Sequence, residues 1–501
     1  MSGHLSNRPW ALAAVLVATF LLPGPVAKPA LSEEPATSPT VQQQANTSGI
    51  TFSAPYGRHT DDLEGMLKRR NIRALVLINP IGFFYDNGQP MGVDYQALSA
   101  LETFVNQKYK TRALKVQVTF IPVRPDQIEA ALQQGIGDVI AYALVITPGR
   151  QQQVAFTVPL QENVDQIVVS GPKFGSVSSL EGLGGKQIYL SPLLASYEKL
   201  QQVSQNLQKA GKPPILIKDA DKNLLEDDLV EMVNSGMIPA TVTSATRAKL
   251  WAQVLPNLTP HYDLVIASGQ QTAWAVRKNS PQLKQLLDEF IAPRALGTSF
   301  GNTLLRRYLQ NTQWVRNSIS PDEMKKFQTL VAYFKKYGNE YGFDYLMIAA
   351  QGYQESRLEQ NKRGPDGAVG IMQVIPKYAA APPISVPNVT TAEDNIEAGV
   401  KMLYQIERQY FNDPKIDRLN RTLMAFASYN AGPNRIAQLR QQAQKQGLDP
   451  NVWFGNVELV VAQDIGQVTV TYVGNVYKYF VAYQLAMGDQ AQKTSGAQTG
   501  H

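Results

Sequence analysis

The chain has 501 residues, of which 44% are hydrophobic and 18% are charged. These values are typical of a folded protein, and the length predicts two or three domains. The formal net charge of +6 is small for a chain of this length. It suits an anionic polymer or a lipid surface, and it does not predict a nucleic-acid-binding protein.

The usage of cysteine and histidine excludes several kinds of chemistry. The chain has no cysteine, which excludes disulfides, thiolate zinc sites, cysteine nucleophiles and lipid attachment through a cysteine. Its histidines are His4, His59, His261 and His501, so residues 262–500 contain no imidazole. Ser-His-Asp hydrolysis and histidine-ligated zinc are therefore not expected in the C-terminal part, and we predict no metal and no organic cofactor.

Residues 1–27 have the pattern of a signal peptide. Arg8 precedes an apolar stretch at residues 10–22, and small residues surround Ala27. The apolar stretch is shorter than the about 20 residues that a spanning helix needs, so export is predicted, and retention as an N-terminal anchor stays open. Residues 28–55 are rich in Pro, Ser, Thr and Gln, a composition that predicts a disordered linker.

Residues 56–300 alternate short β-like runs with helical stretches, as βα units do. This alternation predicts a two-lobed α/β domain with a mostly parallel sheet in each lobe. The expected strands are 75–78, 116–121, 138–141, 187–190, 214–217 and 275–276, and the expected helices are 94–105, 126–134, 196–210 and 225–235.

Several motifs in this domain resemble the family 3 periplasmic solute-binding proteins, the amino-acid receptors of uptake systems. The motifs lie at residues 84–94, 137–140, 146–150, 154–159 and 179–186. The resemblance implies a periplasmic-binding-protein-like fold and a small ligand.

In that family an arginine at the position of Arg150 pairs with the carboxylate of the ligand, for which its planar fork is suited. Two departures bear on this role. Val145 stands where the family usually has a hydroxyl residue, and no acid stands near Thr243 and Ser244 in the sequence to take a ligand amine. A structural arginine in a domain without a ligand therefore remains the alternative.

Residues 301–319 form a connector with a short expected helix at 304–309, and residues 320–487 follow as an all-α domain. Ser320 and Pro321 predict its first helix, through an N-cap followed by a proline at the first helical position. The expected helices are 321–338, 344–355, 392–410, 419–428, 434–446 and 468–487. We expect residues 488–501 to be a disordered tail.

Glu355 is the candidate general acid of the all-α domain. Asp344 can cap a helix whose apolar stripe ends near Glu355. At this end the carboxylate faces the negative end of the helix dipole and lies beside an apolar face, and both effects raise the pKa. A lone glutamate is more often a solvated surface residue, so the prediction depends on the motifs around it.

Four motifs in a fixed order resemble the family 1 lytic transglycosylases, the Slt-type lysozyme-like enzymes that cleave peptidoglycan. They are Glu355-Ser356, residues 367–373, residues 427–432 and Tyr472-Val473. The resemblance implies cleavage of the MurNAc-GlcNAc β-1,4 bond with formation of 1,6-anhydroMurNAc ends. Glu355 would be the single general acid and base, because the N-acetyl group of the substrate assists.

The same resemblance implies the residues that support Glu355. Tyr472 should point its hydroxyl at Glu355, although the family often has a glutamate four positions earlier, where this chain has Val468. The predicted substrate-binding residues are Ser356, Met372, Gln373, Tyr429, Asn430 and Tyr472, with Tyr429 and Asn430 on a turn.

Two alternatives stay open. A lysozyme-like hydrolase would use Glu355 to activate water, with Glu359 or Asp366 as the nearest candidates for a second carboxylate. A non-catalytic sensor would bind cell-wall glycan or a solute and cleave nothing.

The order of the two domains resembles that of membrane-associated lytic transglycosylases. It implies a periplasmic protein associated with the outer membrane of a Gram-negative bacterium, with peripheral membrane contact. The N-terminal domain would regulate the lytic one or sense a ligand such as a muropeptide. We expect a monomer.

Overall fold

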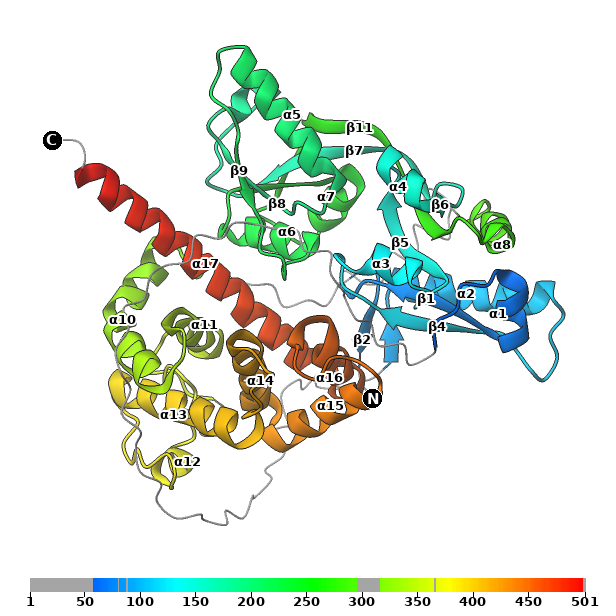
Figure 1. Ribbon diagram of the computed structural model, residues 1–501. Coiled ribbons are helices and arrows are strands. Elements are labelled where there is room, and N and C mark those ends of the chain that lie inside the picture. The colour runs from blue at the N-terminus through cyan, green and yellow to red at the C-terminus, as the bar shows by residue number, and fades with distance from the viewer. Residues whose placement is uncertain (1–56, 80, 87–88, 295–315, 365, 499–501) are drawn as a thin grey trace, which may run out of the picture. The chain divides into compact units, whose positions relative to one another are not determined.

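The computed structural model describes residues 57–79, 81–86, 89–294, 316–364 and 366–498 (Figure 1). The predicted signal peptide or anchor at 1–27 and the linker at 28–55 lie outside the described residues. So does most of the connector, including the helix expected at 304–309. Within the described part, no helix is both long and apolar enough to cross a membrane.

The first lobe of the α/β domain is built on a parallel sheet. Strand β1 (Asn71–Val76) lies between β4 (Gln117–Pro122) and β5 (Val139–Val145) and pairs parallel with both. All but the first residue of β1 are buried, as expected for a strand covered on both faces. The other elements of this lobe are α1 (Leu63–Arg69), β2 (Phe84–Asp86), β3 (Gln89–Met91), α2 (Val93–Lys108), α3 (Ile128–Gln133), α4 (Pro148–Gln153) and β6 (Val154–Phe156).

The prediction of a separate parallel sheet in each lobe is wrong. One sheet with the order β10-β7-β11-β5-β1-β4 runs through both lobes, and only β8 and β9 form a parallel pair of their own. The long strands β7 (Gln161–Ser170) and β11 (Thr259–Arg277) pair antiparallel with each other and with their other neighbours. Polar residues interrupt the apolar pattern of β11, and its pairing with β7 shifts register several times. For this reason the sequence predicted only residues 275–276 of this strand.

The second lobe surrounds the far ends of β7 and β11. Its strands and helices alternate as predicted. The elements are a 3-10 turn (Leu180–Leu183), β8 (Gln187–Leu190), α5 (Ala195–Lys209), β9 (Leu216–Asp219), α6 (Glu226–Ser235), β10 (Ala240–Ser244) and α7 (Ala245–Trp251). Helix α8 (Pro281–Ile291) belongs to the first lobe, where the amides of Gln282 and Leu283 donate to Asp62.

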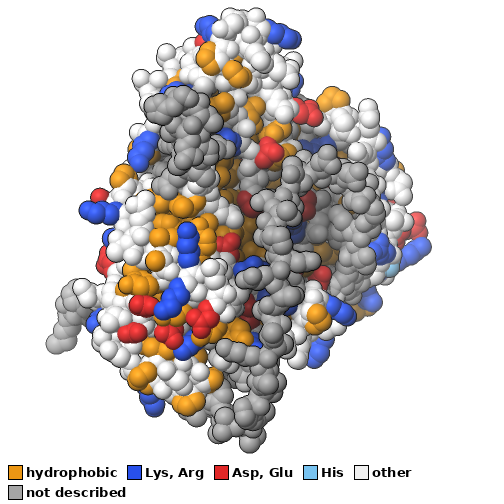
Figure 2. All heavy atoms as spheres, turned by 60° about the vertical axis from the view of Figure 1, so that its left-hand side comes forward, with side chains coloured by type: hydrophobic (Ala, Val, Ile, Leu, Met, Phe, Trp, Pro, Cys, Tyr) orange, Lys and Arg blue, Asp and Glu red, His pale blue; other side chains and the backbone are white. Residues whose placement is uncertain are grey.

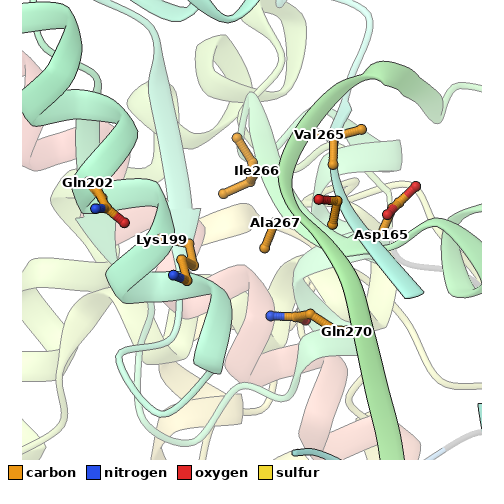
Figure 3. Close-up of a pocket in the computed structure, with 8 residues that line it drawn as sticks. Asp165, Lys199, Gln202, Val265, Ile266, Ala267 and Gln270 are labelled. Atoms are coloured by element: carbon orange, nitrogen blue, oxygen red, sulfur yellow. The ribbon is translucent and has the colours of Figure 1, made fainter. Parts of the chain in front are cut away.

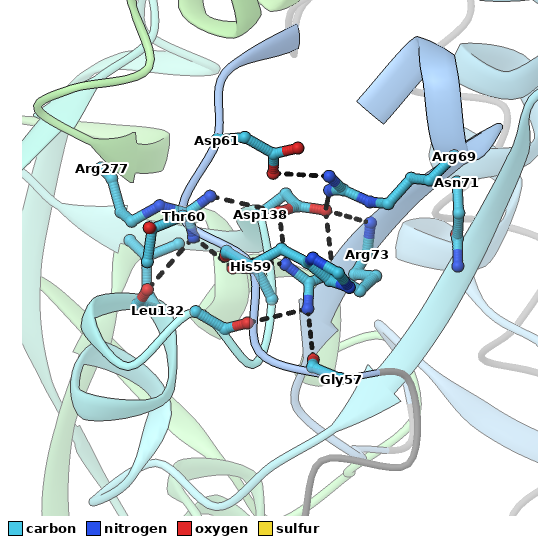
Figure 4. A network of polar contacts seen from close by, with 12 residues as sticks. Gly57, His59, Thr60, Asp61, Arg69, Asn71, Arg73, Leu132, Asp138 and Arg277 are labelled. Carbon is cyan, nitrogen blue, oxygen red and sulfur yellow. Dashed lines mark hydrogen bonds and ion pairs between the residues drawn. The ribbon is translucent and has the colours of Figure 1, made fainter. Parts of the chain in front are cut away.

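A buried carboxylate at the start of β5 fixes the beginning of the α/β domain (Figure 4). Asp138 accepts hydrogen bonds from Arg69 at 2.7 Å, from Arg73 at 2.7 and 3.1 Å, and from Arg277 at 3.1 Å. Burial by itself would raise the pKa of Asp138, but the hydrogen bonds and charge of Arg73 and the charge of Arg69 outweigh it and hold the pKa below its usual value. Arg73 also donates to the carbonyls of Gly57 and His59, so the network ties the incoming chain to the sheet.

The C-terminal domain is all-α, as predicted. Its helices are α10 (Pro321–Tyr341), α11 (Tyr345–Ser356), α12 (Pro376–Ala380), α13 (Ala392–Tyr410), α14 (Arg418–Ala431), α15 (Pro433–Lys445), a π-helical turn (Trp453–Val457), α16 (Glu458–Ile465) and α17 (Gln467–Gln498). The side chain of Ser320 accepts from the Glu323 amide and that of Asp344 from the Leu346 amide, so both predicted N-caps are present.

The C-terminal helix differs from the prediction. We expected it to end at residue 487 and a disordered tail to follow, but α17 extends to Gln498. No proline interrupts this segment, and Gly488 and Gly496 weaken the helix without ending it. The sequence also gave no prediction of α12 and α16, which are short.

The surface carries charges of both signs. Figure 2 shows basic and acidic side chains interspersed on one face, with hydrophobic side chains between them. This mixture agrees with the small net charge of +6. On this face, therefore, charge does not form a field of a single sign.

Candidate active site

Glu355 is the second-last residue of α11, where the predicted helix ends. The next residue, Arg357, adopts a left-handed conformation with φ of 59°, and its amide donates to the carbonyl of Tyr353 at 2.9 Å. This cap stops the helix directly after Ser356. The carboxyl group therefore lies at the negative end of the helix dipole, as the sequence led us to expect.

Tyr472 of α17 contacts the carboxyl group of Glu355. Its hydroxyl donates a hydrogen bond to Oε1 of Glu355 at 2.6 Å, and the tyrosine is buried. Helix α17 packs along α11, which brings together two residues that are 117 positions apart (Figure 1). The contact is the one that the sequence predicted.

The environment of Glu355 favours its neutral form. Burial raises the pKa of Glu355 to about 7, and the hydrogen bond from Tyr472 lowers it in part. No described lysine or arginine forms an ion pair with this carboxyl group. Glu355 therefore holds a proton over part of the neutral range and can also exist as a carboxylate there.

The sequence reasoning missed one residue of this site, Gln351. It lies one turn before Glu355 on α11, and its Nε2 donates to the hydroxyl of Tyr472 at 3.3 Å. The side chain is fully buried. The sequence could have indicated Gln351, because it lies four residues before Glu355 and positions i and i+4 share one face of a helix.

Ser356 holds a loop and does not face an open groove. It is buried, its hydroxyl lies 2.8 Å from the carbonyl of Ile371, to which it donates, and it accepts from the amide of Glu359 at 3.1 Å. Through these contacts the side chain of Ser356 binds backbone at the end of α11. The bond to Ile371 fixes the loop that follows the glycine-rich segment against α11.

Met372 departs from the prediction that it lines the groove. Its side chain is 0% exposed and fills the space between α11 and α13, where two glycines make room for it. A Cβ on Gly399 would lie 2.6 Å from the Cβ of Met372, and one on Gly352 would lie 3.3 Å from its sulfur. The backbone of Met372 is held as well, because its amide donates to Asn395 Oδ1 at 2.8 Å. The sequence reasoning did not single out Asn395.

Tyr429 lies beside the same loop. Its hydroxyl donates to the carbonyl of Met372 at 2.7 Å. Burial, and then the negative charge of Glu355, raise the pKa of Tyr429 well above its usual value. Tyr429 therefore stays protonated and keeps this hydrogen bond at neutral pH.

Two predicted polar residues remain accessible. Asn430 is exposed and Gln373 is partly exposed. The predicted turn at Asn430 is wrong, since α14 continues through Ala431 and turns only at Gly432. The side chain of Asn430 accepts from the hydroxyl of Thr469 at 2.9 Å. Gln373 has a φ of 48°, a strained value for a side chain with a Cβ, and such strain is common at binding sites.

The candidates for a second carboxylate are placed differently from Glu355. Glu359 is exposed and pairs with Lys326 at 3.2 Å. Asp366 is exposed on the glycine-rich loop. Neither has the buried environment that raises the pKa of Glu355.

Arg150 of the α/β domain has partners within its own lobe. Its Nε donates to Glu129 at 2.8 Å and its Nη1 to the carbonyl of Val145 at 3.1 Å. These contacts are the ones expected of a structural arginine.

The structure also brings an acid to Thr243, where the sequence showed none nearby. The hydroxyl of Thr243 donates to Glu226 of α6. Arg247 pairs with Asp227 at 2.6 Å and with Glu226 at 3.5 Å. The charge of Arg247 also acts on Asp94 of α2. Burial raises the pKa of Asp94 to about 7, and the charge of Arg247 opposes this rise. An ionisable cluster therefore lies at the position where the sequence reasoning found no acid.

Figure 3 shows a pocket on the α/β domain. Its residues come from β7, α5 and β11, and none of them contacts Glu355. They are Asp165, Lys199, Gln202, Val265, Ile266, Ala267, Ser268 and Gln270. The candidate chemistry at Glu355 is separate from this pocket.

Comparisons with known proteins match both domains. Residues 332–451 match the family described as transglycosylase SLT domain, and residues 76–295 match bacterial extracellular solute-binding proteins, family 3. Several curated relatives carry the name membrane-bound lytic murein transglycosylase F. The protein from Desulfosudis oleivorans is 26% identical over 410 residues, which cover 81% of this chain and 85% of that one. The protein from Shewanella halifaxensis is 26% identical over 387 residues, which cover 75% of each chain.

The chain therefore combines a transglycosylase SLT domain with a family 3 solute-binding domain, and it is similar to lytic murein transglycosylases over most of its length. Glu355, Gln373 and Asn430 lie inside the matched transglycosylase segment, whereas Tyr472 lies beyond its end. Among solved structures, an arginine-bound amino acid ABC transporter substrate-binding protein from Streptococcus pneumoniae is 17% identical. The TM-score is 0.40, and the match covers 50% of this chain and 98% of that one.

Proposed function

We propose that this lytic transglycosylase cleaves the MurNAc-GlcNAc β-1,4 bond of peptidoglycan and leaves 1,6-anhydroMurNAc ends, with Glu355 as its single general acid and base. The observation that carries the proposal is the environment of this carboxyl group. Burial raises its pKa to about 7, and a tyrosine hydroxyl holds it at 2.6 Å. An acid and base that acts near neutral pH needs such a pKa.

The proposed reaction uses the carboxyl group of Glu355 twice, first to give one proton and then to accept another. Glu355 donates its proton to the leaving O4 of GlcNAc while the bond from C1 of MurNAc to that oxygen breaks. The Glu355 carboxylate then accepts the proton of the C6 hydroxyl of MurNAc. The freed oxygen attacks C1 and closes the 1,6-anhydro ring. Glu355 is protonated again, and no water is consumed.

The alternative is a hydrolase. A glycosidase with two carboxylates needs the second group at roughly 5 to 9.5 Å, in an environment suited to its role. The candidates Glu359 and Asp366 are exposed, and Glu359 is paired with Lys326. These facts favour the single-acid mechanism, in which the N-acetyl group of the substrate stabilises the positive charge at C1.

The other predicted residues take separate roles in the proposal. Tyr472 orients Glu355. The loop beside it is held by the hydrogen bond from Ser356 to the Ile371 carbonyl and by the one from the Met372 amide to the side chain of Asn395. The accessible amides of Gln373 and Asn430 are suited to hydrogen bonds with sugar hydroxyl and acetamido groups.

The α/β domain is proposed to bind a small ligand and to regulate the lytic domain. The name of the curated relatives supports a periplasmic protein that associates peripherally with the outer membrane of a Gram-negative bacterium. In this chain a cysteine cannot carry the membrane anchor, because none is present. We propose a monomer without metal or organic cofactor.

The test is mass spectrometry of the soluble products after purified peptidoglycan is incubated with the protein. Products with 1,6-anhydro ends are expected, and Glu355→Gln should release them at least about 100-fold more slowly, because an amide cannot transfer the proton. Glu359→Gln is the matched control and should release them at the wild-type rate. Reducing ends would establish the hydrolase instead. No product from the wild type would favour the non-catalytic sensor.

A further inference from the structure

Gln351 and Glu355 meet at one hydroxyl group. They are one turn apart on α11, and Tyr472 Oη lies 3.3 Å from Nε2 of Gln351 and 2.6 Å from Oε1 of Glu355. Gln351 and Tyr472 are both buried, so water does not compete for these contacts. The three side chains form a short hydrogen-bonded row, in which Tyr472 of α17 links Gln351 and Glu355 of α11.

A contribution to the stability of the fold does not explain why residue 351 has an amide side chain. Its Oε1 is buried and has no hydrogen-bond partner among the described residues. An unpaired buried carbonyl lowers the free energy of unfolding, and an apolar side chain of the same length would avoid that loss. The neighbouring positions of α11 are indeed apolar, with Ile348, Ala349 and Ala350 fully buried.

The direction of the hydrogen bonds explains what the amide does. Tyr472 has one hydroxyl proton, and burial, followed by the charge of Glu355, raises its pKa well above the usual value, so that proton is retained. The nitrogen of Gln351 can only donate. It therefore occupies a lone pair of the tyrosine oxygen and leaves the tyrosine proton for Glu355.

We infer that Gln351 is a positioning residue for the reaction, which acts through Tyr472 by keeping the tyrosine proton directed at Glu355. The inference rests on the proposed function of Glu355. A donated hydrogen bond polarises the hydroxyl and makes it a better donor in turn. The row therefore stabilises the carboxylate that forms once Glu355 has given its proton to the leaving oxygen.

The titratable side chains that face Glu355 are Tyr472 from α17 and Tyr429 from α14. Tyr429 donates its proton to the carbonyl of Met372, so it does not replace Tyr472 as a donor to Glu355. Gln351 itself is uncharged. A change in the pKa of Glu355 after substitution of Gln351 therefore reports on the row.

The test follows the pKa of Glu355 by NMR in protein labelled with ¹³C at the glutamate carboxyl carbon, with Glu355→Gln to assign the signal. Gln351→Met should raise this pKa by about 0.5 unit, because the tyrosine becomes a weaker donor. The turnover number on peptidoglycan should fall roughly tenfold, with half-saturation changed by less than about twofold. The melting temperature should stay equal or rise. Gln351→Leu is the second variant.

A double-mutant cycle with Tyr472→Phe separates positioning from packing. In the Tyr472→Phe background, Gln351→Met should shift neither the pKa nor the turnover number further. Gln354→Met, on the same helix, is the matched control and should behave as the wild type.

Wild-type values in Gln351→Met, or an equal effect in both backgrounds, would overturn the inference. A shifted pKa in a protein that releases no product would instead contradict the proposed function and leave the hydrogen-bonded row in place.

Discussion

Asp138 and Glu355 are two shielded carboxyl groups with opposite surroundings. Asp138 is held by three guanidinium groups, and its pKa lies below the usual value. Glu355 is held by one neutral hydroxyl, and burial raises its pKa to about 7. The surroundings of Asp138 are therefore suited to a structural role, and those of Glu355 are suited to proton transfer. A carboxylate surrounded by cations cannot give or take a proton near pH 7, whereas one beside a neutral donor can.

The largest effect on stability is expected from Asp138→Asn. Removing the charge leaves Arg69, Arg73 and Arg277 close together without their anion, and breaking a buried ion pair costs about 3–5 kcal/mol. Urea denaturation measures the loss. Glu355→Gln is the paired control, and it should keep the stability while it loses activity. If Asp138→Asn were as stable as the wild type, the contrast between the two sites would fail.

The dependence of stability on pH should have opposite signs at the two sites. Glu355 binds its proton more tightly in the folded protein, so its contribution is present below pH 4.5 and is lost as the pH rises to about 7. The loss is on the order of 2–3 kcal/mol. Asp138 behaves in the reverse way, and its contribution is lost as the pH falls below 3.8.

The measurement is the urea midpoint at pH 5 and pH 8 for the wild type and for Glu355→Gln. Asp94, Glu407 and Glu458 also have pKa values of about 7, so only the difference between the two proteins reports Glu355. The wild type should lose more stability than the variant between these pH values. Equal losses would show that Glu355 has an ordinary pKa.

Activity should decline above pH 7, because the protonated acid is lost.

Ser356→Ala should have an intermediate effect. The change removes the hydroxyl, which leaves the buried carbonyl of Ile371 without its donor and the amide of Glu359 without its acceptor. This loss costs about 1–3 kcal/mol. Activity should fall too, since the loop beside Glu355 is released. Thermal unfolding and product release measure the two losses. Retained activity at wild-type stability would assign Ser356 no role in holding the loop.

The smallest effect is expected at Val468, where the family often has an acid. This valine is 69% exposed at the start of α17. Val468→Glu should change the free energy of unfolding by less than about 0.5 kcal/mol. The added charge is screened by solvent, so it should raise the pKa of Glu355 only slightly, as a pH-rate profile can show. A large gain in activity would mean that the missing acid limits this enzyme.

The local features of the fold followed from the sequence. Ser320 and Asp344 cap their helices through hydrogen bonds within two or three residues, and such contacts need no tertiary structure. The strand β8 and the helix α13 have the predicted bounds, because their periodicity and end signals are local too. The sheet was predicted less well, since the pairing of β7 with β11 joins segments about 100 residues apart.

Sequence by itself determined the helix that ends beside Glu355, the order of the motifs and the classes of chemistry that are excluded. Tertiary structure decided which of the motif residues can act. It buried Met372 and engaged Ser356 with backbone. It also brought Gln351 into hydrogen-bond contact with Tyr472, and Glu226 into hydrogen-bond contact with Thr243. The physical reason is that burial and hydrogen-bond direction depend on neighbours from distant segments. The same residue type can therefore be a packed side chain or part of a catalytic site.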